Sequence, residues 1–62
     1  MNHKVSECRK ACGMTQKQVA EMAGISERMY QHIEAGTRIG SISTLLKIGT
    51  ALGKTVEDLF SE

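Results

Sequence analysis

The sequence predicts an all-α protein, a compact bundle of five short helices that forms a single domain over residues 1–62. Apolar residues recur at three- and four-residue intervals, which is the spacing of one helix face, and no β-branched run of strand length appears. Glycines and capping residues divide these periodic segments into short pieces. A chain of 62 residues has room for one small core and none for a second domain that senses a small-molecule effector.

The first helix is predicted over residues 3–12. Val5, Cys8 and Cys12 fall at i, i+3 and i+7, which places them on one side as an apolar stripe. Gly13 then ends the helix as a left-handed cap. On a helix, Cβ atoms four residues apart lie about 5–6 Å from each other, farther than the roughly 3.5–4.5 Å of a disulfide. We therefore expect two reduced thiols that face the core, with a redox or metal role as the alternative.

Residues 15–36 are predicted to form two helices joined by a tight turn. Thr15 and Gln18 have the spacing of a capping box, which begins a helix that runs to about residue 22. Gly24 lies at the turn, and Ser26 is the expected N-cap of a helix that runs to about residue 35. Two helices and a short turn with glycine make the helix-turn-helix plan.

Two further helices are predicted to complete the bundle. One covers about residues 43–52, and its apolar positions are Leu45, Ile48, Ala51 and Leu52. Thr55 with Asp58 begins a short fifth helix. Its apolar residues either close the core or face a second subunit; they are Val56, Leu59 and Phe60.

The chain also resembles a known family through a set of spaced positions. These positions are Gly13, Met14, Thr15, Gln16, Val19, Ala20, Ala23, Gly24, Ile25, Tyr30, Ile33, Glu34, Gly36, Leu45, Ile48, Leu52 and Gly53. With this pattern the chain resembles the helix-turn-helix proteins of the Cro and phage-repressor type, also called Xre-type. The resemblance implies a lambda-repressor-like DNA-binding domain that acts as a cytoplasmic transcriptional regulator, a homodimer on a palindromic operator. Relatives often carry a proline within residues 39–43, where this chain has none.

The resemblance also implies roles for three side chains. Arg9 is expected to form a structural ion pair with Glu34, whereas the alternative is an arginine that points to water. Gln16, at the start of the first motif helix, is expected to contact a base edge or a phosphate.

The second motif helix, over residues 26–35, has an apolar side and a polar side at 100° per residue. Its polar side holds Glu27, Arg28, Gln31, His32 and Ala35. Such a face is commonly only solvated, but the N-terminal half of this helix is the part that enters the major groove. Arg28 has the two parallel donors that guanine accepts, and Glu27 can accept from cytosine. Gln31 and His32 are expected to reach bases farther along.

Three residues are predicted to contact phosphates beside that groove, namely Lys17, Thr37 and Arg38; a flexible surface loop is the alternative for the last two. The net charge is only +1, but its distribution is uneven. Residues 1–54 hold all eight Lys and Arg and four Glu, a balance of +4, whereas residues 55–62 hold three acids, a balance of −3. A basic body with an acidic end predicts a small number of phosphate contacts per subunit.

Enzyme, metal and membrane functions are not expected. No nucleophile-base-orienter set, no paired carboxylates in a cleft and no glycine-rich phosphate loop is indicated, and no apolar run approaches the roughly 20 residues of a membrane span. Only His3 and His32 are available to join the cysteines at a metal. We therefore expect no catalytic residue, metal or cofactor, and a cytoplasmic location. The competing function is a protein-interaction module of antitoxin or cofactor type that keeps the fold without specific DNA readout.

Overall fold

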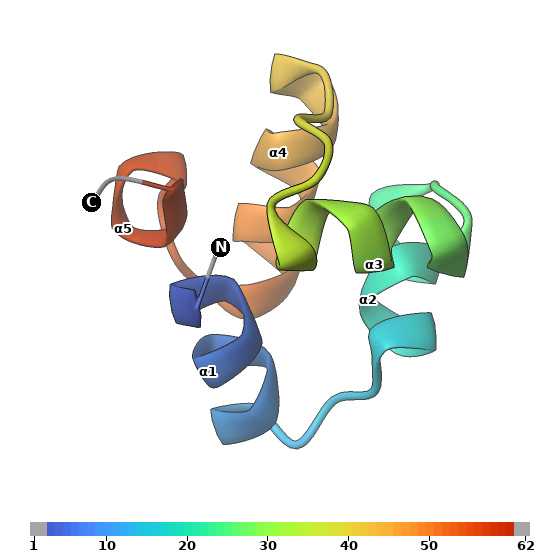
Figure 1. Cartoon of the computed structure of the whole chain (residues 1–62). Helices are drawn as coiled ribbons and strands as arrows, with labels where there is room; N and C mark the ends of the chain where they lie inside the picture. The colour runs from blue at the N-terminus through green and yellow to red at the C-terminus, as the bar shows by residue number, and fades with distance from the viewer. Residues whose placement is uncertain (1–2, 61–62) are drawn as a thin grey trace.

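A computed structural model describes residues 3–60 and folds them into five helices, with no strand in this range (Figure 1). The helices are α1 (His3–Ala11), α2 (Gln16–Ala23), α3 (Glu27–Ala35), α4 (Ile42–Leu52) and α5 (Val56–Phe60). In Figure 1, α3 crosses the middle of the molecule, α2 packs against both α3 and α4, and α1 lies beside α5. The predicted all-α bundle of five short helices is confirmed.

One apolar core joins all five helices. Its buried side chains are Val5, Val19, Ala20, Ala23, Tyr30, Ile33, Leu45, Ile48, Leu52 and Leu59. Leu59 is only 1% exposed, and Val56 and Phe60 are half-buried against the same core. Leu59 therefore closes the core within the chain, with Val56 and Phe60 packed beside it, and the contact of α5 with a second subunit stays a prediction.

Hydrogen bonds from N-cap side chains fix the first residues of α2 and α4. The capping box at α2 has both of its bonds: the Thr15 hydroxyl accepts from the Gln18 N–H at 3.1 Å, and the Gln18 side-chain oxygen accepts from the Thr15 N–H at 2.8 Å. At α4 the Ser41 hydroxyl accepts from the Thr44 N–H at 3.2 Å. Because Ser41 is the N-cap, α4 begins at Ile42, one residue earlier than the predicted start at residue 43.

The expectation that both cysteines face the core is wrong for one of them. Cys8 is half-buried against the core, whereas Cys12 is exposed. Cys12 still donates its N–H to the Cys8 carbonyl at 3.0 Å and so keeps its helical position, but it follows the last residue of α1 and stays exposed at the end of the apolar stripe. The Cys12 thiol instead lies 3.8 Å from the carbonyl oxygen of Leu52, and both thiols are free.

Gly24 makes the turn between α2 and α3 with φ of 71°, in the left-handed region. A Cβ added there would meet only the Lys47 ammonium at 4.0 Å, so an alanine would be strained by its backbone conformation and not by crowding. We expect Gly24→Ala to lower the free energy of unfolding by about 1–2 kcal/mol, measured by urea denaturation. Gly13→Ala, also at φ 71° and in open space, should lose a similar amount. An unchanged urea midpoint for Gly24→Ala would contradict this account of the turn.

Candidate nucleic-acid interface

Helix α3 buries one side and exposes the other. Tyr30 and Ile33 have no exposed surface, whereas Glu27, Arg28 and Gln31 are exposed. The helix is fixed at both ends, because Ser26 caps its start with a 3.1 Å bond from the Met29 N–H and Gly36 caps its end at φ 80°. The exposed row is therefore presented by a helix that the core holds in place.

The side chains of Glu27 and Arg28 make no hydrogen bond or ion pair with any other described residue. Both lie in the first turn of α3 and are exposed. All the guanidinium donors of Arg28 and both carboxylate oxygens of Glu27 are consequently available to a ligand on this surface. A side chain that contacts bases needs donors and acceptors that are free in this way.

His32 and Thr37 are joined to each other across the end of α3. The Thr37 hydroxyl donates to the backbone carbonyl of His32 at 3.2 Å, and the same oxygen lies 2.9 Å from His32 Nδ1. The hydroxyl has a single proton, so the direction of the 2.9 Å bond depends on the tautomer of the ring: a hydrogen on Nδ1 leaves Nε2 as an acceptor, and a hydrogen on Nε2 makes it a donor. A phosphate contact through the Thr37 hydroxyl would have to replace the bond that its proton makes to His32.

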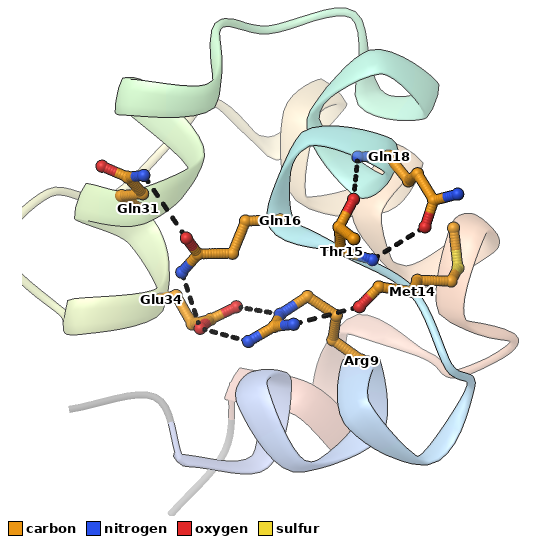
Figure 2. A network of polar contacts seen from close by, with 7 residues as sticks. All are labelled: Arg9, Met14, Thr15, Gln16, Gln18, Gln31 and Glu34. Carbon is orange, nitrogen blue, oxygen red and sulfur yellow. Dashed lines mark hydrogen bonds and ion pairs between the residues drawn. The ribbon is translucent and has the colours of Figure 1, made fainter.

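Four polar side chains from α1, α2 and α3 form a connected chain that we call the glutamine relay: Arg9, Glu34, Gln16 and Gln31 (Figure 2). Arg9 donates from Nε to Glu34 Oε2 at 2.9 Å and from the guanidinium Nη2 to Oε1 at 3.2 Å. Gln16 Nε2 donates to Glu34 Oε1 at 3.1 Å, and Gln31 Nε2 donates to Gln16 Oε1 at 3.3 Å. Gln16, the first residue of α2, thus links the ion pair to the exposed row of α3.

The ion pair is largely withdrawn from water, since the Arg9 and Glu34 side chains are 13% and 10% exposed. Burial by itself would raise the pKa of Glu34, but the hydrogen bonds from Arg9 and Gln16 outweigh it and hold that pKa below its usual value. Arg9 also donates to the Met14 carbonyl at 3.0 Å. Burial and the nearby Glu34 carboxylate raise the pKa of Tyr30, whose hydroxyl has no hydrogen-bonded partner among the described residues.

The two basic residues predicted at phosphates lie on either side of α3 in the sequence. Lys17 is exposed in the first turn of α2, and Arg38 is exposed in the loop between α3 and α4. Sequence reasoning did not single out the exposed apolar side chains near that loop. Ile39 is 87% exposed and Ile42 is 68% exposed, although loops and helix starts are ordinarily polar.

The glutamine relay was also missed as a unit. Gln16 and Gln31 are 15 residues apart, and Gln16 and Glu34 are 18 apart, so no local spacing brings them together. Only the crossing of α2 and α3 does so. Among the described residues, no group of three His, Cys, Asp or Glu side chains is placed to hold a metal ion. No helix in that range has the length and apolar character to cross a membrane.

Comparisons with known proteins give one family and one relative. A family model described as helix-turn-helix matches residues 5–59. An uncharacterized HTH-type transcriptional regulator of Bacillus subtilis (strain 168), YgzD, is 33% identical over 60 residues, which cover 97% of this chain and 91% of the relative. No solved structure matches significantly.

Proposed function

Since this chain belongs to the Cro/C1-type helix-turn-helix family, a family of non-enzymatic DNA-binding transcriptional regulators, we propose that it reads a specific DNA sequence as a homodimer on a palindromic operator. The observation that carries the proposal is that Glu27 and Arg28, in the first turn of α3, are exposed and bonded to no other described residue. The opposite side of the same helix is buried in the core. A rigid helix with free polar side chains on its outer face is suited to the major groove.

The base contacts are assigned by the chemistry of the side chains along α3. Arg28 donates two parallel hydrogen bonds to O6 and N7 of guanine, and Glu27 accepts from the amino group of cytosine or orients Arg28. His32 offers Nε2 farther along the groove: with its hydrogen on Nε2 it donates to a base acceptor or a phosphate oxygen, and with its hydrogen on Nδ1 it accepts from a base amino group. Gln31 contacts a base edge, and Gln16 accepts a hydrogen bond from its amide.

Lys17 and Arg38 are the proposed phosphate contacts, because both are exposed cations on segments next to α3. A phosphate contact contributes equally to every sequence and releases counterions. We expect Arg38→Ala to weaken binding to all DNA sequences alike and to reduce the slope of log affinity against log salt by about 1. Titrations at several salt concentrations measure this slope. Lys54→Ala, which removes an exposed cation at the far end of α4, should leave it unchanged, and an unchanged slope for Arg38→Ala would remove Arg38 from the interface.

A second copy of the chain is proposed because one recognition helix reads few base pairs. Two copies reading half-sites about 34 Å apart double the contacts, and their twofold symmetry requires a palindromic operator. Large apolar side chains exposed in the α3–α4 loop and in the first turns of α4 support self-association, since exposed apolar surface is commonly covered by a partner. Ile39, Ile42 and Leu46 are 87%, 68% and 55% exposed.

Selection of bound sequences from a random DNA library tests the whole proposal. Enrichment of two inverted half-sites with one-turn spacing is the expected result, together with a dimer in sedimentation equilibrium on that site. The net charge of +1 favours the competing function, a protein-interaction module on the same fold. That function would be supported if the library gave no enriched sequence and binding to mixed DNA did not respond to salt.

A further inference from the structure

Gln16 and Gln31 belong to different helices, yet their side-chain amides are directly bonded. Gln31 Nε2 donates to Gln16 Oε1 at 3.3 Å, while Gln16 Nε2 donates to Glu34 Oε1 at 3.1 Å (Figure 2). Gln31 is exposed and lies on the same face of α3 as Arg28, whereas Gln16 is half-buried. Gln16 therefore lies between a buried anchor and a side chain on the proposed reading surface.

Glu34 determines which atom donates and which accepts in each hydrogen bond of the glutamine relay. An ionised carboxylate can only accept hydrogen bonds, so the amide nitrogen of Gln16 has to face Glu34. The oxygen of Gln16 consequently faces Gln31, and Gln31 has to present its own nitrogen in return. Glu34 stays ionised because Arg9 donates two bonds to it, and its pKa lies below the usual value.

This direction limits what Gln31 can offer to a base. One of its two N–H groups is used by Gln16, which leaves the carbonyl oxygen and one N–H. That pair matches adenine, which presents an amino donor beside the N7 acceptor in the major groove. Guanine presents two acceptors, O6 and N7, and would set one of them against the glutamine oxygen. A glutamine without the relay can turn both N–H groups toward guanine.

We propose that Gln16 is a positioning residue for base readout: held by Glu34, it fixes the amide of Gln31 so that Gln31 selects adenine and rejects guanine. The inference rests on the proposed function, because it needs α3 in the major groove. It adds to that function the base that one side chain prefers and the residue that sets the preference.

The test is a library selection with four proteins: the wild type, Gln31→Ala, Gln16→Met and Lys17→Met. Gln31→Ala identifies the base pair that Gln31 reads, as the one position whose preference disappears. At that position the wild type should favour adenine over guanine. Gln16→Met keeps the length of the side chain and removes its hydrogen bonds, so the adenine-to-guanine ratio should fall by about two- to tenfold there and stay the same elsewhere.

Lys17→Met is the matched control, since it introduces the same side chain at the next residue of α2, outside the relay. It should leave the adenine-to-guanine ratio unchanged even if it weakens binding overall. A merely structural role for Gln16 would change affinity for all sequences and not this ratio. Thermal melting followed by circular dichroism establishes that each variant is folded.

Three results would overturn the inference while the proposed function stands: a wild-type preference for guanine at the Gln31 position, an unchanged ratio in Gln16→Met, or no position that depends on Gln31. The first of these needs only the wild type and Gln31→Ala, so it decides the matter even if Gln16→Met does not fold. A wild type that enriches no sequence at all overturns the proposed function itself.

Discussion

Arg9→Met should lower the free energy of unfolding by about 3–5 kcal/mol, the range found when one member of a buried ion pair is removed. The Glu34 carboxylate would be left 10% exposed with the amide of Gln16 as its remaining donor, and the Met14 carbonyl would lose its bond at 3.0 Å. A chain of this length has a total stability of roughly 3–9 kcal/mol, so the loss is a large fraction of it. Urea denaturation followed by circular dichroism measures the change.

Lys10→Met is the control for Arg9→Met, because Lys10 is exposed on the same helix and its loss should change stability by no more than about 0.5 kcal/mol. The Arg9–Glu34 ion pair also predicts how the difference in stability between the wild type and Arg9→Met depends on pH. The pKa of Glu34 is lower in the folded protein than in the unfolded chain, so its pairing stabilises the fold above the unfolded value and is lost as pH falls through the folded value. The wild type and Arg9→Met should therefore converge in stability in acid. A constant difference at every pH would show that Arg9 contributes through packing and its bond to the Met14 carbonyl, and not through Glu34.

The helices were predictable because their signals are local. The Thr15–Gln18 capping box, the glycine at position 24 and the apolar spacing within each helix involve residues at most a few positions apart. The misses are also local and have simple causes. The start of α4 is one residue earlier than predicted because Ser41, and not a later residue, accepts the capping bond from Thr44. For Cys12, the helical angle predicts a place on the apolar side, but the residue follows the end of α1 and stays exposed.

Gly49 shows where propensity misleads. A glycine in the middle of α4 weakens the helix by itself, but a Cβ at this position would lie 2.6 Å from the carbonyl oxygen of Lys54. The chain that leaves α4 folds back against this residue on its way to α5. Such a close approach depends on the path of the chain after the helix, which residue spacing within the helix does not encode.

The polar face of α3 could be derived from the sequence, since it follows from the helical angle of each residue once the N-cap at Ser26 is located. The contacts of that face with other helices could not. Family resemblance, and not spacing, suggested the Arg9 and Glu34 pair, and nothing suggested that Gln16 would bridge it to Gln31. Interactions between helices depend on crossing geometry, which the local spacing of residues does not reveal.

Arg28→Ala should reduce affinity for the operator by about 1–3 kcal/mol, or roughly 5- to 150-fold, and should relax the base preference at one position of each half-site. Arg28 is exposed and has no partner among the described residues, so no bond within the fold has to break before the guanidinium meets a guanine. For the same reason the substitution should change stability by no more than about 0.5 kcal/mol. Titrations on the selected operator and on a variant with that guanine replaced measure the two effects.

The decisive comparison for Arg28 is with Arg38→Ala on operator and on random DNA. A base contact is lost only on the operator, whereas a phosphate contact is lost on both, since every sequence carries the same backbone. Arg28→Ala should therefore reduce the ratio of the affinity for the operator to the affinity for random DNA, and Arg38→Ala should leave that ratio unchanged. If Arg28→Ala weakened both kinds of DNA equally, the guanidinium would be holding a phosphate, and the first turn of α3 would owe its base readout to Glu27 instead.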